Sequence, residues 1–191
     1  NNVAGPMCST SSISIAKLMK KYPSRALDVG ISEEHAIVFA SGIAVNSYHP
    51  YVTIYSTFLQ RSYDEISHDV CRMDLPVTLM VDHSGLVGSD GETHQGLYDL
   101  SFFKLIPNIV IMAPKNFKEL EAMMEYAIEL KCPVVIRYPR GSEEDINIPC
   151  KDIKLGKCEK IKMGKDVTIV SIGKMVPKAL ELISLVIPLK P

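Results

Sequence analysis

Polar and aromatic side chains follow several apolar segments of this 191-residue sequence, within a few residues of the point where each segment ends. In chain order they are Glu33, His35, Tyr55, Phe58, Arg61, His83, Asp90, His94 and Arg140. If the segments are parallel strands, their carboxyl ends lie at one edge of a sheet, which is where open α/β sheets bind ligands. The set therefore predicts a small-molecule site, with an anion as one candidate ligand, and does not by itself name a reaction.

Each of these residues also has an ordinary structural explanation. Glu33 would stand in the opening turn of a helix, where the helix dipole favours a carboxylate. Phe58 would suit an apolar core, and Arg61 could form a surface ion pair with Asp64 or Glu65. The prediction of a site therefore rests on the whole set rather than on any one member.

The elements that would position these residues are apolar segments that alternate with longer helix-like segments. The predicted strands are 26–31, 51–56, 77–83, 109–114 and 134–139. Ser32 can cap a helix that begins at Glu33, and Asn116 with Glu119 forms a capping-box pattern. This order predicts an α/β fold, a mostly parallel sheet flanked by helices on both faces.

The length allows one domain with a proper core and a partial second unit. We expect a fragment of a longer chain, with an N-terminal linker or remnant at 1–21, the α/β domain at 22–142, a linker at 143–164 and the start of a further domain at 165–191. This last part comprises a predicted strand at 165–173 and a predicted helix at 175–187, which are too few elements to form a domain.

The composition argues against several classes of protein. A net charge of −1 gives no general attraction to nucleic acid or to an anionic membrane, and no apolar run reaches the roughly 18 residues that span a bilayer. The five cysteines are scattered without zinc-binding spacing, which predicts reduced thiols in a reducing compartment. Dinucleotide-binding, Walker A and G-x-S-x-G motifs are missing from the sequence, so those activities have no support.

Four motifs in order along the chain carry a family resemblance. They are DVGISEEHAIVFASGIAV (28–45), IYSTFLQRSYDEISHDV (54–70), DHSGLVGSDGETHQGLYDLSFFKLIPNIVIMAP (82–114) and RYPRG (137–141). Over roughly residues 22–142 the chain resembles the middle, pyrimidine-binding domain of the 1-deoxy-D-xylulose-5-phosphate synthases, which are transketolase-like thiamine-diphosphate transferases. The resemblance implies a part in the decarboxylative condensation of pyruvate with glyceraldehyde 3-phosphate, a source of isoprenoid, thiamine and pyridoxal precursors.

The resemblance implies cofactor-binding roles for three residues. Glu33 matches the catalytic glutamate that hydrogen-bonds the pyrimidine ring of thiamine diphosphate and promotes formation of its carbon nucleophile. Phe58 matches the aromatic residue that stacks on this ring, and Arg61 matches a positively charged position near the cofactor. In the family, the diphosphate and its Mg²⁺ are held by a G-D-G…N motif of a preceding domain that this chain lacks. We therefore expect no metal ligand here, and an isolated chain that binds the cofactor poorly and is inactive.

The resemblance also implies a substrate-binding group. Tyr55, His83 and Arg140 match positions that contact the acceptor's phosphate. Asp90 and His94 match catalytic and substrate-binding residues that position hydroxyl and carbonyl groups.

The position of His83 departs from the family pattern. The family usually reads D-R-A-G where this chain reads D-H-S-G (82–85). Histidine is shorter than arginine and only partly charged near neutral pH, so we expect weaker phosphate binding or compensation by another base.

Partners and location follow from the same resemblance. The expected partners are pyruvate, glyceraldehyde 3-phosphate, the remaining domains of the parent enzyme and a second copy in a homodimer, in a bacterial cytoplasm or a plastid-type organelle. The alternatives are a transketolase, the β-chain of a 2-oxo acid dehydrogenase with a separate α-chain, and a non-catalytic module that kept the fold.

Overall fold

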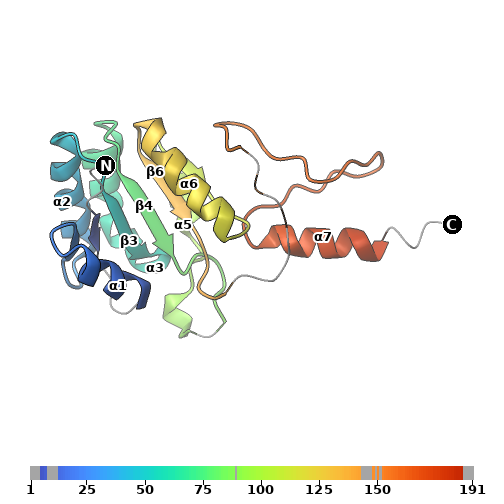
Figure 1. The fold of residues 1–191 in the computed structure, drawn as a ribbon, viewed down its shortest axis with the longest axis horizontal. Helices are drawn as coiled ribbons and strands as arrows, with labels where there is room; N and C mark the ends of the chain where they lie inside the picture. The colour runs from blue at the N-terminus through green and yellow to red at the C-terminus, as the bar shows by residue number, and fades with distance from the viewer. Residues whose placement is uncertain are drawn as a thin grey trace.

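A computed structural model describes residues 5–7, 13–88, 90–142, 148, 150 and 152–186, with backbone alone for 5–7, 13–16 and 186. Cys8 and parts of the predicted terminal and linker segments lie outside these residues. The described chain forms one twisted sheet with helices packed against it, and the C-terminal helix extends away from the sheet (Figure 1).

The sheet has six strands, all parallel, in the order β2-β1-β3-β4-β6-β5. They are β1 (Gly5–Met7), β2 (Ala26–Asp28), β3 (Tyr51–Tyr55), β4 (Thr78–Asp82), β5 (Val110–Met112) and β6 (Val134–Arg137). In the register of the two central strands, Tyr51 pairs with Thr78 and Tyr55 with Asp82. All five predicted strands are present, each shorter than its apolar segment, and the prediction of a parallel sheet is confirmed.

Strand β1 is a finding that the sequence did not predict. Its three residues lie in the segment 1–21, which was predicted to be a linker, yet they pair with both β2 and β3. A helix, α1 (Ile13–Lys21), follows. A three-residue strand is too short to show an apolar pattern, and this one contains both glycine and proline, which are depleted from strands.

The remaining helical elements connect the strands, except α7, which follows the last strand. They are α2 (Glu33–Val45), α3 (Ser56–Leu59), η1 (Gln60–Ser62), α4 (Tyr63–Glu65), η2 (Ile66–Cys71), η3 (Glu92–His94), α5 (Asp99–Phe103), α6 (Phe117–Leu130) and α7 (Met175–Val186). The segments α3 to η2 form one nearly continuous helical stretch with local 3₁₀ and π geometry.

Two apolar clusters lie on opposite faces of the sheet. Leu79 and Val81 of β4 belong to a cluster that includes Ile37 of α2. Met80, the residue between them, belongs to a second cluster with Met123 of α6. Because successive strand residues point to opposite faces, helices cover both faces as predicted, and β3 and β4 lie between α2 and α6 in Figure 1.

One of the two predicted helix caps is present. The Asn116 side chain accepts a hydrogen bond from the Glu119 backbone N–H (2.9 Å) at the start of α6. The Glu119 carboxylate, however, accepts from the backbone N–H and the ammonium group of Lys115, both at 2.7 Å, so the reciprocal half of the box is shifted by one residue. Ser32 occupies the cap position of α2, but its side chain makes no capping hydrogen bond.

The segment after the sheet differs from expectation in two ways. Residues 165–173 do not form the predicted strand; Val167 and Val170 are 78% and 89% exposed. A strand needs a neighbour for its hydrogen bonds, and none of the described strands lies beside this one. Helix α7 confirms the predicted helix, and part of the predicted linker is docked on α6, where the Leu155 backbone N–H donates to the Tyr126 hydroxyl.

Candidate functional site

Eight of the nine residues predicted to form a site are joined by contacts at the carboxyl edge of the sheet. They come from the start of α2, the end of β3, the segments α3 and η1, the loop after β4 and the end of β6. In order of contact they are Glu33, Arg61, Phe58, His94, Tyr55, His83, Asp90 and Arg140. The ninth, His35, lies on the exposed side of α2 and stacks on Phe39.

The glutamate of the site is buried and held by an arginine. Glu33 is 4% exposed at the first position of α2, and its Oε1 accepts a hydrogen bond from Arg61 at 2.9 Å. Arg61 therefore pairs with Glu33, and the surface pair with Asp64 or Glu65 does not form. Among the described residues, Glu33 Oε2 has no hydrogen-bond partner, so it can accept a hydrogen bond from a ligand.

Aromatic rings form the wall beside this glutamate. Phe58 stacks on Tyr55 with centroids 5.8 Å apart, and its ring meets the His94 ring edge-on at 5.3 Å. The Arg61 guanidinium lies 5.1 Å from the centre of the Phe58 ring. These distances suit the offset and edge-to-face attraction of π systems and a cation–π contact, which fix the wall's orientation.

His83 is buried between two carboxylates. Its ring stacks on Tyr55 at 3.8 Å, Nδ1 lies 3.0 Å from Asp82 and Nε2 lies 3.0 Å from Asp90. Neither contact has hydrogen-bond geometry, so both ring nitrogens are buried without a hydrogen-bond partner among the described residues. The backbone of His83 has φ +57, a left-handed conformation, and its ring stacks on the last residue of the neighbouring strand β3.

Asp90 also pairs with Arg140, three residues beyond the end of β6. The same oxygen that faces His83, Oδ2, accepts a hydrogen bond of 2.7 Å from Arg140. Partial desolvation acts to raise the pKa of Asp90, but it is outweighed by the hydrogen bond and charge of Arg140, with smaller contributions from Gly91 and His94. The pKa of Asp90 is therefore lowered, and the carboxylate is ionised at neutral pH.

The loop that carries Asp90 and His94 is closed by glycines and clamped by a glutamine. Gly85 and Gly96 exchange two backbone hydrogen bonds, of 2.7 and 2.9 Å. The Gln95 side chain accepts from the Val87 N–H at 2.8 Å and donates to two carbonyl groups of the loop. Sequence reasoning recognised the loop from its glycines but missed Gln95, which no local pattern distinguishes from a solvated residue.

A buried polar network lies beneath the same strand ends. Asp99 is 1% exposed and accepts two hydrogen bonds from Arg137, at 2.8 and 3.2 Å, and one of 3.0 Å from the Ser84 hydroxyl. Ser84 directly follows His83, and Arg137 lies three residues before Arg140. The network therefore links the ends of β4 and β6. No sequence pattern predicted it, because the paired residues lie far apart in the chain.

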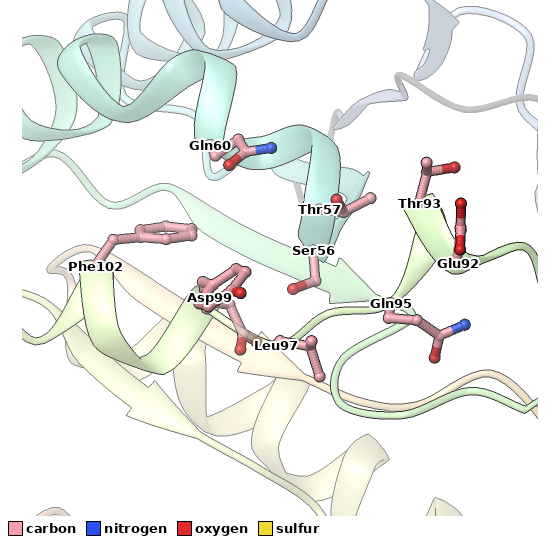
Figure 2. A pocket seen from close by; sticks show the side chains of 10 residues that line it. Ser56, Thr57, Gln60, Glu92, Thr93, Gln95, Leu97, Asp99 and Phe102 are labelled. Atoms are coloured by element: carbon pink, nitrogen blue, oxygen red, sulfur yellow. The ribbon is translucent and has the colours of Figure 1, made fainter.

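A hollow of about 230 Å³ lies between the start of the helical stretch after β3 and the loop after β4 (Figure 2). It is lined by Ser56, Thr57, Gln60, Glu92, Thr93, Gln95, Leu97, Tyr98, Asp99 and Phe102. The hydroxyl of Ser56 is buried without a hydrogen-bond partner in the described structure and approaches Gly96 closely. A β-carbon on Gly96 would lie 2.3 Å from the His83 carbonyl oxygen, so glycine is required there.

The described residues offer neither a metal site nor a membrane span. No group of three or more histidine, cysteine or acidic side chains is placed to hold a metal ion. Within the same residues, no helix has both the length and the apolar character needed to cross a membrane.

Comparison with known sequences gives a family and a set of relatives. A family model described as "Transketolase, pyrimidine binding domain" matches residues 8–144. The chain is 47% identical over 173 residues to the 1-deoxy-D-xylulose-5-phosphate synthase of Clostridium acetobutylicum, and 50% identical over 169 residues to that of Natranaerobius thermophilus. These matches cover 90% and 87% of this chain but 28% and 27% of the relatives, so the chain spans about a quarter of their length.

Comparison with solved structures agrees with the sequence match. A structure described as "Split gene transketolase, inactive beta4 tetramer" superposes with a TM-score of 0.85 at 27% identity, over 97% of this chain and 60% of that one. A transketolase mutant from Pichia stipitis superposes with a TM-score of 0.59 at 22% identity, over 71% of this chain and 22% of the other, which shows the shared fold.

Proposed function

The chain belongs to the transketolase pyrimidine-binding domain family, and we propose that it is the pyrimidine-binding part of a 1-deoxy-D-xylulose-5-phosphate synthase. The observation that carries the proposal is the unbroken set of contacts from Glu33 to Arg140. These contacts hold a buried carboxylate, an aromatic wall and the guanidinium of Arg140 along one edge of the sheet. The synthase relatives, at 47–50% identity, favour this activity over others of the family.

The residues present fit the pyrimidine end of thiamine diphosphate. Glu33 is fixed by Arg61 through one oxygen, which leaves Oε2 to meet a ring nitrogen. Phe58 supplies an aromatic face beside it, held in place by Tyr55 and His94. When bound, the cofactor would supply the carbon nucleophile that the reaction needs, while Glu33 would hold the proton at the pyrimidine nitrogen.

The substrates would bind on the far side of the aromatic wall. The overall reaction joins two carbons of pyruvate to the three carbons of glyceraldehyde 3-phosphate and releases the pyruvate carboxyl group as carbon dioxide. Arg140, Tyr55 and His83 would contact the acceptor's phosphate, where the arginine fork suits phosphate oxygens. Asp90 and His94 would position the acceptor's hydroxyl and carbonyl groups by hydrogen bonds.

The rest of the site would come from outside this chain. We propose that a preceding domain of the parent enzyme binds Mg²⁺ and the cofactor's diphosphate, and that the enzyme is a homodimer. The split transketolase neighbour is described as inactive, which supports the expectation that this chain is inactive alone. The bacterial source of the synthase relatives favours the bacterial cytoplasm as the location.

The boundaries of this part can also be proposed. We place the domain from β1 to about residue 142, because β1 pairs within the sheet. Residues 143–164 then form the connection, part of it docked on α6, and 165–191 begin a further domain.

Steady-state assays of the full-length enzyme test the proposed function. With pyruvate and glyceraldehyde 3-phosphate, we expect product formation and equimolar carbon dioxide, and a loss of at least about 100-fold in kcat for Glu33→Gln, because a positioned acid–base group contributes roughly 10²–10⁴-fold. Glu34→Gln is the matched control, since Glu34 is the exposed neighbour in the same helical turn. Activity with a ketose phosphate donor and none with pyruvate would favour the transketolase alternative instead.

A further inference from the structure

A single carboxylate bridges the two basic groups at the end of the sheet. Asp90 Oδ2 lies 2.7 Å from the Arg140 guanidinium and 3.0 Å from His83 Nε2. On the other side of the ring, Asp82 lies 3.0 Å from His83 Nδ1. We call these four residues, Asp82, His83, Asp90 and Arg140, the strand-end corner.

The charges of the strand-end corner do not favour the binding of an added anion such as phosphate. Two carboxylates face one guanidinium and one imidazole, so the corner is neutral when the imidazole is charged and negative when it is not. The other arginine of the site, Arg61, is already paired with Glu33. A phosphate dianion that enters this arrangement therefore meets like charge at the position where it would bind.

The two carboxylates of the corner differ in how firmly they are held. Asp82 is the last residue of β4, and its Oδ1 accepts a hydrogen bond of 2.6 Å from the His83 backbone N–H. Asp90 lies in a loop, its side chain is 22% exposed, and it is followed by an exposed glycine, Gly91. Rotation of the Asp90 side chain toward solvent would release both basic groups without moving the sheet.

We propose that Asp90 is an internal counter-ion that competes with an incoming phosphate for Arg140 and His83, and thereby sets how strongly the site distinguishes phosphorylated from unphosphorylated ligands. The statement about ligands rests on the proposed function, since that function names a phosphorylated acceptor. The competition itself rests on the contacts of Asp90 alone. It predicts that removing an acidic residue from the site strengthens anion binding.

Binding of inorganic phosphate to the full-length enzyme tests this proposal. Calorimetry is done at neutral pH with saturating thiamine diphosphate and Mg²⁺. The bound cofactor then prevents inorganic phosphate from binding at the diphosphate site. We expect Asp90→Asn to tighten phosphate binding by about five- to tenfold, the effect of removing one partly screened like charge at contact distance. Glu92→Gln, an exposed residue of the same loop, makes the same change in net charge and should alter the affinity less than about twofold.

Two further variants locate the effect. Arg140→Gln combined with Asp90→Asn should abolish the gain, because the cation that Asp90 masks is then missing. Asp90→Ser should reproduce the gain if Asp90→Asn does not fold. Unchanged or weaker phosphate binding in a folded Asp90 variant would overturn the proposal. An enzyme that binds phosphate as expected but does not convert pyruvate and glyceraldehyde 3-phosphate would instead overturn the proposed function alone.

Discussion

The buried pair of Asp99 and Arg137 makes the sharpest prediction about what holds the strand ends in place. Asp99 is 1% exposed and the Arg137 side chain 14% exposed, and two hydrogen bonds join them. Removing one partner of a buried ion pair leaves the other charge without compensation, which costs about 3–5 kcal/mol. Since a domain is stable by about 5–15 kcal/mol, Asp99→Asn or Arg137→Met alone should remove a large share of the stability.

Urea unfolding of the 191-residue chain, followed by circular dichroism, measures this loss. At about 2–4 °C per kcal/mol for a chain of this size, the melting temperature should also fall by at least about 6 °C. The double variant, Asp99→Leu with Arg137→Met, should lose much less than the sum of the single losses, because apolar replacement of a whole buried pair is often close to neutral. Glu92→Gln, on the surface, should stay within about 0.5 kcal/mol of the unchanged chain.

The reasoning would be refuted if each single variant lost less than about 1 kcal/mol, or if the two losses were simply additive. Either result would mean that solvent already screens the pair. The strand ends would then be held by backbone pairing rather than by Asp99.

Three other predictions concern the loop, the α6 contact and the thiols. Gly96→Ala should lower the melting temperature and impair the site, because its β-carbon would lie 2.3 Å from a carbonyl oxygen; differential scanning calorimetry should show this, and an unchanged transition would contradict the close approach. Burial acts to lower the pKa of Lys115, but Glu119 and Glu159 outweigh it and the pKa is raised. The stabilisation that the charged Lys115 gives is therefore complete below the unfolded-state pKa of about 10.4. It is lost as pH rises through the higher folded-state pKa. The stability difference between the unchanged chain and Lys115→Met should accordingly hold up to about pH 10 and shrink above it, and a difference that stays constant above that pH would contradict the ion pair. Desolvation, with nearby acidic charge, raises the pKa of the buried Cys71 thiol to about 12, so iodoacetamide at pH 8 should label the exposed Cys158 and spare Cys71 until the chain unfolds, as read by mass spectrometry.

Much of the fold could be predicted because strands β4 and β6 are buried on both faces. The segment around β4 is a continuous apolar run, and four of its five strand residues are buried. Strand β1 has no such run, and its place in the sheet depends on pairing with strands that follow it in the chain. Residues 165–173 show the opposite case, since their pattern is that of a strand but no described strand lies beside them.

The site could be predicted as a set of residues but not as a set of contacts. Strand-end spacing and the family motifs identified the residues that meet at the edge of the sheet. They did not show that Arg61 would form its ion pair with Glu33, which is 28 positions away, rather than with acidic residues in its own helix. They also did not show that His83 would be enclosed by carboxylates, because that depends on the left-handed backbone at its position.

Calorimetric titration of thiamine diphosphate in the presence of Mg²⁺ tests the central claim most directly. We predict tight binding to the full-length enzyme, little binding to the 191-residue chain, and weaker binding to full-length Glu33→Ala, because the chain holds the pyrimidine end of the cofactor while another domain holds its diphosphate. Tight binding to the isolated chain without Mg²⁺, or binding by the full-length enzyme that Glu33→Ala leaves unchanged, would contradict this division of the site.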